Sequence, residues 1–111
     1  MATAVEPFRE SLTADELRRT FEELAGAWRK RTRYWSFIQK MVATPEYQRI
    51  IGLGPQVIPV ILSDLQREPA PWFRALSALT GENPVDPAGP GRIKAMMDAW
   101  LKWGTDNGWI A

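Results

Sequence analysis

The 111-residue sequence predicts an all-α protein, a compact bundle of four to six helices. Three observations predict this fold class. Apolar residues recur at steps of three and four along most of the chain, which is the spacing of a helix with one buried face. Capping residues, prolines and glycines stand where these segments begin and end. No segment shows the strict alternation of apolar and polar residues that indicates a half-buried strand.

The first helix is expected at residues 14–30. Thr13 and Glu16 have the spacing of a capping box, which satisfies the free amides of a helix start. The residues before it, 1–12, are expected to form a flexible N-terminal arm, so residues 13–111 make a single helical domain. The apolar stripe of this first helix consists of Leu17, Phe21, Leu24, Ala25 and Trp28.

A short second helix is expected within residues 31–43, where apolar side chains fit a helical stripe although Thr32, Tyr34 and Ser36 lower the helix propensity. The third helix has clearer ends, because Thr44 caps it and Gly52 stops it. Pro45 suits its first position.

Two further helices are expected between Pro55 and Gly81, packed as an antiparallel hairpin with Pro59 kinking the first of them. Residues 82–91 contain three prolines and two glycines and are expected to form a loop. A last helix at residues 92–103 should end at Gly104, followed by an apolar tail.

Two resemblances add to this pattern. Residues 54–65 (GPQVIPVILSDL) are similar to a helix of a HEAT repeat, which implies a HEAT-like antiparallel hairpin over residues 54–81. Residues 45–104 resemble small uncharacterised prokaryotic proteins, through PEYQRIIGLG at 45–54, WFRAL at 72–76, TGENPV at 80–85 and AWLKWG at 99–104. This second resemblance implies a bacterial or archaeal source and mobile-element or toxin–antitoxin surroundings. It implies no activity and no functional residues.

The composition excludes several classes of function. The chain has no cysteine and no histidine, so it has no disulfide, no thiolate or imidazole metal ligand and no imidazole base. We therefore expect no enzyme activity, no cofactor and no metal. The first ten residues lack the apolar run of a signal peptide, and residues 57–62 are far shorter than the roughly twenty residues of a membrane span. A cytoplasmic protein with no membrane contact is expected.

Charge is segregated along the chain, although the net charge is only +1. Residues 24–45 contain five basic residues and no acidic one, and the segments on either side are slightly acidic. Within this basic part, aromatic residues bracket four cations at residues 28–35. The predicted partner-binding residues are Arg29, Lys30, Arg31, Arg33, Tyr34 and Trp35.

Two functions use such a segment. The first is a non-catalytic protein–protein interaction module, with an antitoxin or an adaptor as candidate roles and an acidic protein as partner. The alternative is a nucleic-acid-binding protein, in which the cations pair with phosphates and the aromatic rings stack on bases. A purely structural role is also open, because cations at a helix C-terminus complement the helix dipole. The sequence leaves the oligomeric state open.

Two weaker features complete the prediction. Glu82, Asn83 and Asp86 offer two carboxylates and an amide for acid–base or cation chemistry, but turn formation is the simpler role. The six tryptophans are more than one small core needs. At least three are expected in the core, and those left outside are candidate interface anchors. Met96 and Met97 are expected either in the core or in an adaptable apolar patch beside them.

Overall fold

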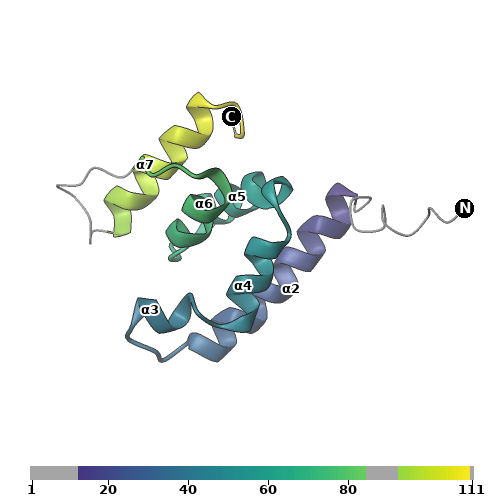
Figure 1. Cartoon of the computed structure of the whole chain (residues 1–111), viewed down its shortest axis with the longest axis vertical. Coiled ribbons are helices and arrows are strands. Elements are labelled where there is room, and N and C mark those ends of the chain that lie inside the picture. Colours follow the sequence, from purple (N-terminus) through teal and green to yellow (C-terminus); the bar gives the residue numbers. More distant parts are fainter. Residues whose placement is uncertain (1–12, 85–92, 111) are drawn as a thin grey trace, which may run out of the picture.

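All regular structure in the described part of the chain is helical, which confirms the predicted all-α class (Figure 1). The computed structural model describes residues 13–84 and 93–110. The expected arm at residues 1–12 and Asp86 lie outside the described residues. Within the described ranges, six α-helices and one 3-10 turn follow in the order α2 (Ala14–Thr32), α3 (Ile38–Met41), α4 (Pro45–Gly52), η2 (Pro55–Val57), α5 (Ile58–Arg67), α6 (Phe73–Thr80) and α7 (Ile93–Asp106).

Helix α2 begins and packs as the sequence predicts. The Thr13 hydroxyl accepts from the Glu16 amide at 3.1 Å, and the Glu16 carboxylate accepts from the Thr13 amide at 2.9 Å, which completes the capping box. The predicted stripe is buried except at Leu24, which is half-buried against the core. The helix ends two residues later than expected, at Thr32.

The segment after α2 is less helical than expected. Of residues 31–43, the first two extend α2 and only Ile38–Met41 form a separate helix, α3. The Thr32 hydroxyl donates to the Trp28 carbonyl at 2.8 Å, and residues 33–37, which include Tyr34 and Ser36, form no helix. Weak helix propensity therefore wins over the apolar spacing, and α3 buries none of its residues.

Helices α4 and α5 begin and end near the capping residues, prolines and glycines that predict them, with one change. The Thr44 hydroxyl caps α4 at the Tyr47 amide, and Leu53 follows as the C-cap. Gly54 then reverses the chain at φ +86°, a conformation that a residue with a Cβ rarely adopts. Residues 55–57 form a 3-10 turn, and α5 starts only at Ile58. Pro59 thus lies in the first turn of α5, where it removes no hydrogen bond and needs no kink.

For the last two helices, the predicted C-terminus is confirmed for α6 and wrong for α7. Helix α6 ends at Gly81 as predicted, with φ +74° in the left-handed region. Helix α7 continues through Gly104, the predicted stop, to Asp106. Gly104 is instead a packing residue, because a Cβ on it would lie 2.7 Å from Leu62 Cδ1. The turn after α7 uses Gly108, at φ +78°.

One apolar core joins the helices, and aromatic rings form its centre. The Trp72 ring lies 4.8 Å from Trp28, 5.4 Å from Tyr47 and 5.5 Å from Phe21, measured between ring centroids. Helix α4 packs on both α2 and α6, and α7 packs on α5. Figure 1 shows α2 and α4 side by side, with α5 and α6 between them and α7.

The tryptophans divide as expected. Four are buried, namely Trp28, Trp72, Trp100 and Trp103, whereas Trp35 and Trp109 are exposed. The exposed pair has two different surroundings. Trp109 stacks on Trp103, with 6.5 Å between ring centroids, and Trp35 lies in the connection between α2 and α3. No helix in the described ranges is long and apolar enough to cross a membrane.

Candidate partner-binding site

The predicted basic and aromatic residues lie on both sides of the end of α2. Arg29, Lys30 and Arg31 occupy its last turn. Arg33, Tyr34 and Trp35 lie beyond it, within residues 33–37, which we name the aromatic turn. These two halves have different roles in the structure.

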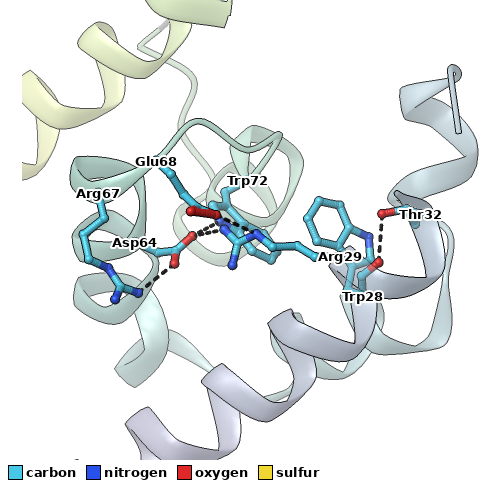
Figure 2. Close-up of polar contacts among 7 residues, drawn as sticks. All are labelled: Trp28, Arg29, Thr32, Asp64, Arg67, Glu68 and Trp72. Carbon is cyan, nitrogen blue, oxygen red and sulfur yellow. Dashed lines mark hydrogen bonds and ion pairs between the residues drawn. The ribbon is translucent and has the colours of Figure 1, made fainter. Parts of the chain in front are cut away.

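Arg29 is bound inside the fold (Figure 2). Its Nη2 lies 2.6 Å from Asp64 Oδ2, and its Nε lies 3.1 Å from Glu68 Oε2. The guanidinium also lies 6.0 Å from the centroid of the Trp72 ring, which adds a cation–π contact. Arg29 therefore holds α2 against the end of α5.

Asp64 is the centre of this cluster and is only 2% exposed. Besides Arg29, its carboxylate accepts from Trp72 Nε1 at 2.8 Å and from Arg67 Nη2 at 3.0 Å. Figure 2 shows these donors reaching the carboxylate from α2, from α5 and from the segment before α6. A buried carboxylate with several donors is a satisfied structural group.

Arg31 is also paired, but at the surface. Its Nε and Nη2 lie 2.9 Å from the two carboxylate oxygens of Glu46, in a bidentate arrangement that joins the end of α2 to the start of α4. The hydrogen bond from Arg31 lowers the pKa of Glu46, and the same bond raises the pKa of Arg31. Lys30 is exposed and has no ion pair with a described residue.

The aromatic turn has a firmly held base. The Trp35 amide donates to the Thr32 carbonyl at 3.0 Å. On the other side, the buried Trp28 Nε1 donates to the Met41 carbonyl at 2.8 Å, and Thr44 Oγ1 donates to the same carbonyl at 2.9 Å. The end of α2 before the turn and the end of α3 after it are therefore both bonded to Trp28.

The tip of the turn is exposed and apolar. Tyr34 is 86% exposed and Phe37 is 60% exposed, and Trp35 and Ile38 are also exposed. Two cations lie beside the rings. The Arg33 guanidinium lies 5.8 Å from the centroid of Tyr34, and Lys40 Nζ lies 5.7 Å from that of Phe37. Large exposed side chains of this kind, gathered in one place and rimmed by charge, mark interaction surfaces.

The structure thus brings together three predicted residues, Arg33, Tyr34 and Trp35, at the surface. It pairs Arg29 with the buried Asp64 and Arg31 with Glu46 at the surface. Sequence reasoning missed Phe37 and Lys40, which belong to the same surface, and Ile38 beside them. The weak helix propensity of residues 32–36 was the available signal, because an apolar residue that follows a non-helical stretch need not lie on a buried stripe.

Of the two predicted carboxylates near residue 82, Asp86 lies outside the described residues and Glu82 makes two contacts within the fold. Glu82 Oε1 accepts from Trp103 Nε1 at 3.1 Å, and the Glu82 amide donates to Thr80 Oγ1 at 3.0 Å. Both contacts support the structural role. Among residues 13–84 and 93–110, no group of three or more Asp or Glu side chains could hold a metal ion.

The described residues form an all-helical fold with an exposed aromatic turn between two hydrogen-bonded helix ends. Comparison with known proteins gives no match, whether with protein-family models, with curated proteins or with solved structures.

Proposed function

We propose that this chain is a non-catalytic protein-interaction module whose contact surface is the aromatic turn. The observation that carries the proposal is the exposure of Tyr34, Trp35, Phe37 and Ile38 along one short stretch. Tyr34 is 86% exposed and Phe37 is 60% exposed, so these two rings contribute little to the core. Tyr, Trp and Arg are the residues most enriched among those that dominate binding energy at protein interfaces.

The rigid base supports the same function. Binding costs conformational entropy when a loop must become ordered. The bonds from Thr32 to Trp28 and from Trp28 to Met41 hold the end of α2 and the end of α3, which flank the turn, before any partner arrives. A partner therefore meets a surface whose backbone is already placed.

The wider setting in this proposal is a prokaryotic cytoplasm, with an antitoxin or an adaptor as the role. The resemblance of residues 45–104 to small prokaryotic proteins supports that setting. The absence of histidine and cysteine supports a non-catalytic role, as does the engagement of Asp64 by three donors.

Single-stranded nucleic acid is the second candidate ligand. The observation in its favour is the pairing of exposed rings with cations, Arg33 on Tyr34 and Lys40 on Phe37. The ion pairs of Arg29 and Arg31 weigh against it, because they remove two of the four clustered cations from phosphate binding. A protein partner needs fewer free cations, so we favour it.

The test starts from a displayed library of bacterial protein fragments selected on the immobilised full chain. Recovered ligands are then measured against the wild type, against Tyr34→Ala with Phe37→Ala, and against a control double variant, Arg18→Ala with Glu22→Ala, on the exposed face of α2. We expect the aromatic double variant to weaken binding by about tenfold or more and the control to leave it unchanged. Ligands that bind all three proteins equally, or a selection that recovers none, would overturn the proposal.

The same proteins are titrated with labelled oligonucleotides of about 16 nucleotides, single- and double-stranded. Measurements at about 50 and about 200 mM salt expose binding driven by counterion release. We expect no binding. Salt-dependent binding that the aromatic double variant abolishes would favour the nucleic-acid function instead.

A further inference from the structure

A cleft begins next to the aromatic turn, because Ile38, which directly follows Phe37 in the sequence, is one of its lining residues. It has a volume of about 200 Å³ and lies between α3, the beginning of α6 and the first turn of α7. In Figure 1, α3 and the first turn of α7 lie on the same side of the molecule. We name it the α3–α7 cleft, and its apolar lining consists of Ile38, Val42, Pro71, Phe73, Ile93 and Met96.

The size of the cleft limits what it can hold. Pockets for drug-sized ligands and cofactors measure about 300 to 1,000 Å³ and carry converging polar groups. This cleft is smaller, and Arg74 is its one charged lining residue among those described. A single bulky apolar side chain from a partner fits it better than a cofactor does.

The charges around the cleft and the turn are positive. Arg74 lines the cleft, Lys40 lines the hollow beside Trp35 and Phe37, and the Arg33 guanidinium lies 5.8 Å from the Tyr34 ring centroid. Neither hollow is lined by a described carboxylate. Among the described acids, Glu46 is paired with Arg31 and Asp98 with Lys94. A partner whose charges complement this surface must be acidic.

We infer that the cleft and the aromatic turn together bind an acidic protein segment that inserts one bulky apolar side chain into the cleft. Its carboxylates lie against Arg33, Lys40 and Arg74, and its other apolar residues cover Tyr34 and Phe37. The described residues contain no strand, so the segment cannot bind by extending a sheet. This inference rests on the proposed function and adds the chemistry of the partner.

The test is a selection of random displayed peptides on the full chain, followed by affinity measurements on synthetic copies of the enriched peptides. We expect enriched peptides to carry excess Asp and Glu together with Trp, Phe or Leu. Lys40→Glu with Arg74→Glu should weaken their binding by about tenfold or more. The matched control is Arg18→Glu with Arg19→Glu, which makes the same charge change on the exposed face of α2 and should leave binding within about twofold.

A second variant pair tests the cleft itself. Ile38 and Ile93 are both partly exposed, so Ile38→Ser with Ile93→Ser changes the cleft without opening the core. We expect this pair to weaken binding as strongly as the charge reversal does. Circular dichroism of each variant confirms that the helices remain.

The outcomes separate this inference from the proposed function. Peptides that depend on Tyr34 and Phe37 but are neutral or basic, or that ignore the cleft and charge variants, overturn this inference and leave the proposed function standing. Peptides that ignore all of these residues, or no enrichment at all, overturn both. Sedimentation is the last measurement. A dimer that Ile38→Ser with Ile93→Ser dissociates would show that a second copy of the chain occupies the cleft, and this result would overturn the inference of an acidic partner segment.

Discussion

The Arg29 guanidinium lies 2.6 Å from the carboxylate of Asp64, although 35 residues separate them in the sequence. The carboxylate is buried, whereas the side chain of Arg29 is one-third exposed. This pair connects α2 to α5 at the edge of the aromatic core. Its contribution to stability can be separated from that of Arg67, which binds the same carboxylate from the surface.

We predict that Arg29→Met lowers the free energy of unfolding by about 2–4 kcal/mol. The loss leaves a buried carboxylate with fewer donors, and the partial exposure of Arg29 keeps the cost below the upper end for a fully buried pair. Arg67→Met is the matched control and should cost at most about 1 kcal/mol, because its side chain is mostly exposed. Urea unfolding followed by tryptophan fluorescence measures both. Equal losses in the two variants would show that Arg29 has no special role.

Two glycines give a second matched pair. Gly104 and Gly26 both lie inside helices, but a Cβ at Gly104 would meet Leu62 at 2.7 Å and Ile110 at 3.2 Å, whereas a Cβ at Gly26 would meet nothing within 4 Å. We predict that Gly104→Ala destabilises the fold by about 1–3 kcal/mol through overpacking.

Gly26→Ala should have the opposite sign and stabilise the fold by about 0.5–1 kcal/mol, because alanine loses less backbone entropy in a helix. Thermal unfolding by circular dichroism compares the two variants with the wild type. Stabilisation by both substitutions would mean that Leu62 moves aside freely and that Gly104 is not a packing residue.

The periodic helices could be predicted because their signals are local. The capping box of Thr13 and the stop at Gly81 each depend on residues within a turn or two. Gly104 was misread for the opposite reason, since its role depends on Leu62, which lies on another helix and is distant in sequence. A glycine near the end of an apolar stripe has the same local sequence pattern whether it ends the helix or lets a side chain from another helix pack closely against it.

The candidate site shows the same limit. Arg29, Arg31 and Arg33 are nearly consecutive and have the same chemistry, so the sequence treats them as one basic cluster. The structure distinguishes them, because Asp64 on α5 binds Arg29 and Glu46 on α4 binds Arg31. Which cations remain free is therefore decided by tertiary contacts. The exposed rings beyond Thr32 could be predicted in part, because Tyr34 and Trp35 are aromatic residues next to the basic cluster in the sequence.

A third prediction concerns alkaline pH. Tyr47 is fully buried, and burial raises its pKa above the usual value near 10. The folded state therefore holds the phenolic proton more tightly than the unfolded state does. This contribution to stability is fully present below about pH 10 and is lost as the pH rises above that value.

The measurement uses Tyr34→Phe, which leaves Tyr47 as the only tyrosine in the chain. We expect phenolate absorbance to rise together with the loss of helical circular dichroism, because Tyr47 ionises when the fold opens. Its hydroxyl donates to the Pro71 carbonyl at 2.8 Å and accepts from the Ala75 amide at 3.0 Å, so opening requires α4 and α6 to part. A complete phenolate signal from a protein that is still helical contradicts this prediction.

The last prediction separates the core from the aromatic turn. Phe21 is 1% exposed and Phe37 is 60% exposed. We predict that Phe21→Ala costs about 3–5 kcal/mol, as deletion of a buried ring does. Phe37→Ala should change stability by no more than about 0.5 kcal/mol, because its ring removes little apolar area from water in the free protein. Urea unfolding of the two variants measures the difference. A large loss of stability in Phe37→Ala would give this ring a structural role and would remove the reason to assign it to a partner.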